Sequence, residues 1–106
     1  MDKKSALKQQ LSAFKKKAGV AFPIQRMILI GSKAWGKPHK YSDVDLIIVS
    51  SKFKKLDFFQ RGARMYDYWS INSPVDFLCY TPEEFHQLSG QVTLVSKALK
   101  EGIFIK

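Results

Sequence analysis

Hydrophobic residues along the chain follow two different patterns, which predict separate helices and strands. Between Leu7 and Ala18 apolar residues recur three or four positions apart among lysines, so a helix is expected over residues 3–18, ending at Gly19. Short continuous apolar runs rich in β-branched residues predict buried strands at 27–30, 44–49 and 75–80. The first half of the chain is therefore expected to pass from a helix into a sheet.

The second half adds helices to these strands. Apolar residues at helical spacing run from Leu56 to Trp69, although Gly62 falls inside this segment and weakens it. The sequence TPEE at 81–84 has the residues of a capping box and predicts a helix towards Leu88. A last helix over 94–99 stops near Gly102, and residues 103–105 can add a short edge strand. This succession predicts an α/β (α+β) fold with a single mixed sheet covered by helices.

Length and composition narrow the class of protein. The 106 residues, 45% of them hydrophobic, suit one compact domain over residues 1–106 and exclude a multidomain enzyme or a disordered chain. Cys79 is the only cysteine, which excludes an internal disulfide or a thiolate-rich zinc site. No segment has the apolar length of a signal peptide's core or of a membrane span. A cytoplasmic protein that does not bind membranes is expected.

The charge is distributed unevenly. The formal net charge is +9, and all of the excess lies in residues 1–40, because residues 41–106 carry equal numbers of basic and acidic side chains. A basic field of this kind attracts polyanions, so nucleic acid is a candidate partner of the N-terminal region. A solvated lysine-rich face is the alternative, since lysine outnumbers arginine 15 to 3 and lacks the planar fork that reads bases.

Three aspartates occupy positions that are costly for a charge. Asp43 and Asp45 lie two residues apart at the start of an apolar strand, so both carboxylates should point to the same face. Asp76 interrupts the apolar run of another strand. Carboxylates at such spacing repel one another unless a hard divalent cation lies between them, which predicts a site for Mg²⁺ or Mn²⁺, with two ions held by the three aspartates.

A glycine-serine pair precedes these aspartates. Gly31 and Ser32 follow a buried strand and open a turn or helix, where backbone N–H groups and a hydroxyl can bind phosphate. The segment from Gly31 to Lys37 also fits part of a P-loop pattern. However, Pro38 stands where a P-loop needs a serine or threonine to ligate magnesium, so that interpretation is rejected.

These residues, GSKAWGKPHKYSDVDLIIV at 31–49 with VDFL around Asp76, resemble the minimal nucleotidyltransferases of the DNA polymerase β-like superfamily. The resemblance implies a polymerase β palm-like fold over residues 24–106. It implies that Gly31 and Ser32 bind a nucleoside triphosphate and that the aspartates bind two Mg²⁺ ions and form the catalytic site. The resemblance further implies that the protein transfers AMP from ATP to a hydroxyl group. Many relatives have arginines where this chain has Lys33 and Trp35, and Lys33 would take the place of one of them at the phosphates.

The resemblance also bears on partners. It implies a HEPN-type partner protein, with this chain as the antitoxin of a toxin–antitoxin pair. The apolar residues between Phe58 and Trp69 exceed what one buried helix face requires, so an interface with that partner or in a homodimer is expected there. A catalytically weak or inactive partner-binding module and a basic nucleic-acid-binding domain are the alternative functions.

The remaining candidates are interpreted mainly as structural residues. His39 is expected in an exposed loop and His86 on the surface of a helix. Cys79 has the opposite strand parity to Asp76, which predicts an inert, buried thiol. Trp35 either plugs the core or stacks on a base.

Overall fold

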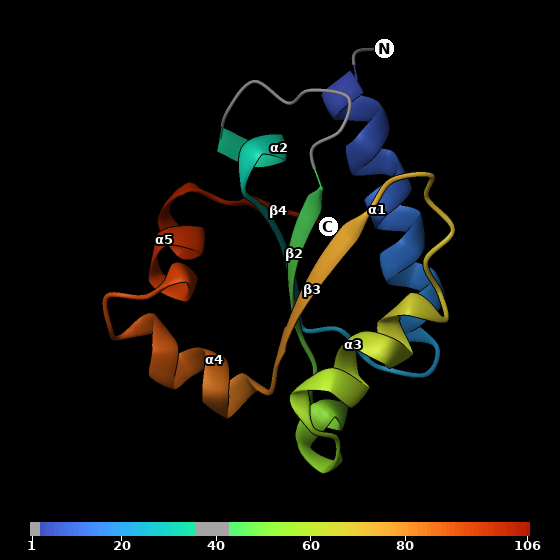
Figure 1. Ribbon diagram of the computed structural model, residues 1–106. Helices are drawn as coiled ribbons and strands as arrows, with labels where there is room; N and C mark the ends of the chain where they lie inside the picture. Colours follow the sequence, from blue (N-terminus) through green and yellow to red (C-terminus); the bar gives the residue numbers. More distant parts are fainter. Residues whose placement is uncertain (1–2, 36–42) are drawn as a thin grey trace.

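The computed structural model describes residues 3–35 and 43–106 and contains one sheet with helices on both sides (Figure 1). Its elements, in chain order, are α1 (Lys3–Gly19), β1 (Arg26–Ile30), α2 (Ser32–Trp35), β2 (Val44–Val49), the 3₁₀ helix η1 (Ser51–Lys55), α3 (Phe58–Tyr66), β3 (Val75–Tyr80), α4 (Pro82–Ser89), α5 (Leu94–Glu101) and β4 (Ile103–Phe104).

The sheet is mixed, as the sequence predicted. Its strand order is β3-β2-β1-β4, with β1 antiparallel to both β2 and β4 and with β2 parallel to β3. Parallel neighbours need a long crossover connection, and η1 with α3 supplies the connection from β2 to β3. The predicted edge strand is confirmed as β4, which lies at one end of the strand order.

Each face of the sheet has its own hydrophobic layer. Helices α1 and α3 cover one face, and α4 and α5 cover the other (Figure 1). Because side chains alternate along a strand, β1 directs Met27 and Leu29 to the α1–α3 layer and Ile28 and Ile30 to the α4–α5 layer. Strands buried on both faces explain the continuous apolar runs in the sequence.

The predicted N-terminal helix is confirmed. Leu11, Phe14 and Ala18 are buried along one stripe of α1, and the ring of Phe14 packs edge-on against Trp69 at a centroid distance of 5.1 Å. The capping box before α4 is also present, because Thr81 and Glu84 exchange backbone and side-chain hydrogen bonds.

The third helix is shorter than the segment 56–69 predicted from the sequence. The residues before it form η1, whose Phe53 is fully buried, and Asp57 then caps α3 in a capping box with Gln60. The helix ends at Tyr66, and Trp69 lies beyond it, where its indole N–H donates to the carbonyl of Ser73. The capping box of Asp57 and Gln60 therefore fixes where α3 begins.

None of the helices in the described residues has both the length and the apolar character needed to cross a membrane.

Candidate active site

Two of the predicted aspartates face each other at the start of the parallel strands. Asp45 is the second residue of β2 and Asp76 the second residue of β3, and the strand register pairs them directly. Paired residues on neighbouring strands share a face of the sheet, so both carboxylates lie on the side of the α4–α5 layer, beyond its apolar residues. The tertiary structure thus brings together two carboxylates that are far apart in the sequence.

The carboxylates of this pair are electrostatically coupled. Asp45 is half-buried, and its side chain shares a hydrogen bond with that of the exposed Asp76. Burial, the charges of Asp76 and Asp43, and this hydrogen bond all raise the pKa of Asp45 above its ordinary value. Because like charges so close together repel, the pair favours any positive charge placed between its oxygens.

Asp43 is exposed and precedes β2, and its negative charge contributes to the raised pKa of Asp45. Within residues 3–35 and 43–106, no group of three or more Asp, Glu, His or Cys side chains is already arranged to hold a metal ion. The donors that do meet are carboxylate oxygens, which are the ligands that Mg²⁺ and Mn²⁺ prefer. A divalent cation therefore fits the chemistry of Asp45 and Asp76, with Asp43 beside them, and the assignment of all three as metal ligands stays a prediction.

The predicted phosphate-binding turn packs directly against these carboxylates. Ile30, the last residue of β1, pairs with Asp45 across the sheet, and Gly31 follows with a φ of 76°. A Cβ atom at Gly31 would overlap the carboxylate of Asp45. Glycine is required here both by the left-handed backbone and by the close approach of the acid.

Helix α2 begins immediately after this turn. The amide of Ala34 donates to the carbonyl of Gly31 at 3.0 Å, and the half-buried Lys33 lies in the same short helix. The ammonium of Lys4 donates to the carbonyl of Ala34 at 3.3 Å, so the start of α1 lies at the same end of the molecule (Figure 1). The side chains of Ser32 and Trp35 and the whole of His39 lie outside the described part of the chain.

Two of the structural interpretations are confirmed. His86 is exposed on α4. Cys79 is fully buried in the α1–α3 layer, and burial raises the pKa of its thiol to about 12. Such a thiol has almost no thiolate at neutral pH and is chemically inert.

The expected interface between Phe58 and Trp69 needs correction. Met65 is fully buried, and the half-buried Trp69 packs against the rings of Phe14 and Phe77, so both side chains belong mainly to the core. Phe58, Phe59 and Tyr66, which the expected interface included, are 45%, 87% and 53% exposed. An exposed apolar stripe of α3 therefore consists of Phe59, Ala63 and Tyr66, with Phe58 exposed beside it, and periodicity alone had not separated these residues from the buried ones.

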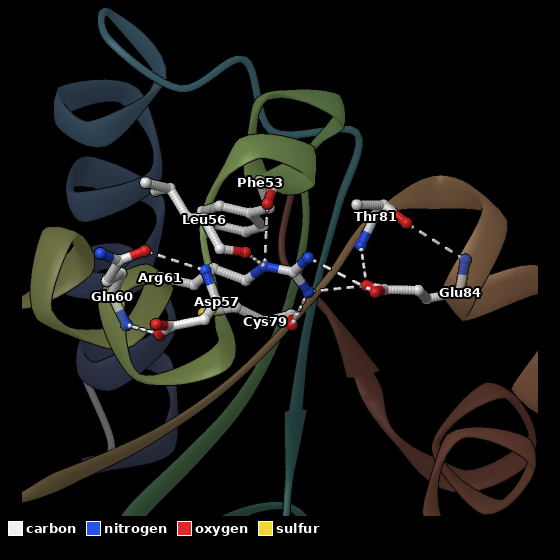
Figure 2. A network of polar contacts seen from close by, with 8 residues as sticks. All are labelled: Phe53, Leu56, Asp57, Gln60, Arg61, Cys79, Thr81 and Glu84. Atoms are coloured by element: carbon white, nitrogen blue, oxygen red, sulfur yellow. Dashed lines mark hydrogen bonds and ion pairs between the residues drawn. The ribbon is translucent and has the colours of Figure 1, made fainter.

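The sequence interpretation missed a buried cation, Arg61, at the opposite end of the sheet (Figure 2). Its guanidinium donates to three backbone carbonyls and forms an ion pair with Glu84 at 2.7 Å. This network joins α3 to the start of α4. The sequence did contain a signal for this residue. Arg61 lies four residues before the apolar Met65, on the same side of the helix, and a charge on a buried side needs polar partners.

Comparisons with known proteins agree with this architecture. The family model described as a nucleotidyltransferase domain matches residues 7–105. A solved structure from Sulfolobus solfataricus, described as a "putative nucleotidyltransferase", has a TM-score of 0.67 and 18% sequence identity, with 95% of this chain and 80% of that chain covered. A search of curated proteins found no significant match.

Proposed function

Because this chain belongs to the nucleotidyltransferase domain family, we propose that it transfers a nucleoside monophosphate, AMP from ATP, to a hydroxyl acceptor. The observation that carries the proposal is the pairing of Asp45 with Asp76 directly beside the turn at Gly31. This arrangement puts carboxylate oxygens next to backbone that can approach a phosphate closely.

The substrate groups are assigned to the residues around this turn. The backbone at Gly31, the hydroxyl of Ser32 and the ammonium of Lys33 bind the triphosphate. Asp43, Asp45 and Asp76 hold two Mg²⁺ ions, a role that Mn²⁺ can also fill. When bound, these ions supply charge neutralisation for the triphosphate and for the pyrophosphate that leaves.

The reaction is an in-line displacement. The acceptor oxygen forms a bond to the α-phosphorus while the bond to pyrophosphate breaks, and Asp76 takes the proton of the acceptor hydroxyl. The charges of Asp76 and Asp43, which help to raise the pKa of Asp45, also favour cations bound among these carboxylates. Catalysis then depends mainly on positioning and electrostatics, as is general for phosphoryl and nucleotidyl transfer.

The test uses ATP labelled at its α-phosphate, with Mg²⁺ and the product of the neighbouring gene as acceptor. We expect release of pyrophosphate and a labelled acceptor with the wild-type protein, and neither with Asp45→Asn. Asp67→Asn is the matched control, because it makes the same change in an exposed acid at the end of α3. Equal transfer by the two variants would contradict the assignment.

The acceptor is presented by a HEPN-type partner protein, and the chain acts as the antitoxin of such a pair. The exposed stripe of Phe59, Ala63 and Tyr66 on α3 supports a protein-binding surface. Gly62 lies beside these residues with open space over its Cα, so a partner side chain has room between the two rings.

This surface is tested by co-purification with the neighbouring gene product. Phe59→Ser should release the partner while leaving thermal stability unchanged, because the ring is 87% exposed. Val92→Ser is the matched control, since Val92 is fully exposed outside α3. A Phe59→Ser protein that retains its partner, or a protein that labels a free small molecule instead, would contradict a partner-borne acceptor.

A further inference from the structure

A pocket of about 280 Å³ lies between the start of β1 and helix α4, at the end of the sheet opposite to the carboxylates. Arg26, the first residue of β1, pairs with Val49 at the end of β2, whereas Asp45 pairs with Ile30 at the other end of β1. The lining of the pocket includes Gln25, Arg26, Val49, Phe85, His86 and Leu99. We call this feature the β1–α4 pocket.

The basic residues of this pocket lie on one face of the sheet. Side chains alternate along a strand, so Arg26 points to the same face as Ile28, which the α4–α5 layer covers. A direct contact agrees with this placement, because the guanidinium carbon of Arg26 lies 5.4 Å from the centre of the Phe85 ring on α4. His86 follows Phe85 on the same helix and lines the same pocket. Arg26 and His86 therefore border one cavity.

The guanidinium of Arg26 is held in place without the use of its hydrogen-bond donors. The buried ring of Phe85 supports it through a cation–π contact. Among residues 3–35 and 43–106, none forms an ion pair with Arg26 or accepts a hydrogen bond from its side chain. Arg61, in contrast, donates to three carbonyls and to Glu84. The donors of Arg26 are therefore available to a ligand.

The charge of the pocket favours an anion. No acidic side chain among the described residues lines it. The planar donor fork of a guanidinium matches the oxygens of a phosphate or carboxylate group and can bind two of them at once. An arginine fixed by a ring, with free donors and no acid beside it in the pocket, is thus prepared to bind such a group.

Two further donors border the pocket. The side-chain oxygen of Gln25 accepts from the amide of Ser51 at 3.2 Å, and its Nε2 donates to the hydroxyl of Ser51 at 3.3 Å. These bonds fix the side chain of Gln25 and leave one N–H of Nε2 for another acceptor. His86 is exposed, and its imidazole carries an N–H in either neutral tautomer. Hydrogen-bond donors therefore come both from the start of β1 and from α4.

We propose that the β1–α4 pocket binds a phosphate group, with Arg26 as its main contact and with His86 and Gln25 as further donors. A phosphate monoester has three terminal oxygens, which suits donors that come from separate elements of the fold, whereas a carboxylate has two oxygens in one plane. The inference is independent of the nucleotidyl transfer proposed above, because this pocket and the carboxylates lie at opposite ends of β1.

The first experiment measures the modification of arginines by phenylglyoxal, located by mass spectrometry, with and without inorganic phosphate at constant ionic strength. At a phosphate concentration ten times the Kd, the modification of Arg26 should be about tenfold slower. Arg64 is the internal control, because it is exposed on α3 outside this pocket and should react at the same rate with and without phosphate. Equal protection of both arginines, or protection of neither, would overturn the proposal.

The second experiment measures the affinity for inorganic phosphate from the chemical shifts of the backbone amides of residues 25–26 and 85–86. Arg26→Gln should weaken binding at these amides about tenfold or more, because it removes a charged donor fork. Arg64→Gln removes the same charge and should bind as wild type. The amides of residues 31–34 report separately on the turn assigned to the triphosphate, so either site can fail without obscuring the other. Equal affinities of the two variants would overturn the assignment to Arg26.

The same titration with phenyl phosphate and benzoate identifies the source of the anion. Val49, Phe85 and Leu99 give the pocket an apolar side, which an organic group attached to the phosphate can contact. Tighter binding of phenyl phosphate than of inorganic phosphate would assign the pocket to a phosphoester, and equal binding would assign it to free phosphate. Benzoate that binds as tightly as phenyl phosphate would overturn the preference for phosphate.

Discussion

Replacing Arg61 by methionine tests how the two helical layers are held together at the end of the sheet far from the carboxylates. Methionine keeps most of the apolar stem of arginine and removes the guanidinium, so the change acts chiefly on polar contacts (Figure 2). The guanidinium joins η1, the end of β3 and the start of α4.

The cost can be worked out from the contacts. The Nε atom donates to the carbonyls of Phe53 and Leu56, each at 2.9 Å, and Nη1 donates to that of Cys79 at 3.2 Å. The carbonyl of Phe53 still accepts from the amide of Leu56 at 3.0 Å, so the change leaves the carbonyls of Leu56 and Cys79 without this donor. The cost is about 1 kcal/mol for each, or about 2 kcal/mol in total. The Glu84 side chain is 45% exposed and still accepts from the amide of Thr81, so water can solvate the orphaned carboxylate.

Urea and thermal unfolding measure this cost. For a domain of this size, about 2 kcal/mol corresponds to a Tm lower by roughly 8–16 °C. Arg64→Met is the matched control, because Arg64 is exposed on the same helix and its loss should change stability by about 0.5 kcal/mol or less. An Arg61→Met protein within about 1 kcal/mol of Arg64→Met would refute the reasoning.

The pH dependence gives a second check on the same network. The hydrogen bond from Arg61 lowers the pKa of Glu84 below its ordinary value of 4.5, against the opposing effect of burial. A carboxyl with a lowered pKa in the folded state stabilises the fold above its unfolded pKa, and this contribution disappears as the pH falls through the folded pKa. Glu84→Gln should therefore destabilise the protein at neutral pH and become equal to wild type in acid.

Three further predictions concern the candidate active site and the core. Gly31→Ala should lower the free energy of unfolding in urea by about 1–3 kcal/mol, because the backbone there has a φ of 76° and the new Cβ atom would overlap Asp45. Gly62→Ala is the control and should be neutral or stabilising, because its Cβ atom would meet no atom within 4 Å. Equal effects of the two substitutions would contradict this prediction. Asp45→Asn should raise the Tm of the metal-free protein at neutral pH, because the raised pKa of Asp45 means that its ionised form destabilises the fold. This gain in Tm should disappear as the pH falls through the pKa of Asp45. A lower Tm of the variant at neutral pH would contradict this prediction. Cys79, with a pKa of about 12, should react with a thiol reagent only after unfolding in urea, and rapid reaction of the native protein would show that the thiol is accessible.

The elements could be predicted from the sequence because their determinants are local. Apolar spacing defined α1, β-branched runs defined the strands, and Thr81 with Glu84 marked the start of α4. The boundaries of α3 could not be predicted in the same way, because Asp57 caps the helix inside the predicted segment and the chain leaves the helix after Tyr66, before Trp69 packs against Phe14.

The same distinction between local and long-range determinants applies to the candidate active site. The sequence by itself determined that Gly31 ends a strand and that Asp45 and Asp76 lie on strands, since period and turn chemistry depend on near neighbours. Only the tertiary structure decided that β2 and β3 pair in the register that places Asp45 opposite Asp76, and that Gly31 packs against Asp45. It also decided that Trp69 packs against the core while Phe59 is exposed, and that Arg61 forms an ion pair with Glu84. These outcomes depend on contacts between distant segments, whose free energies are set by the docking of helices on the sheet and not by local periodicity.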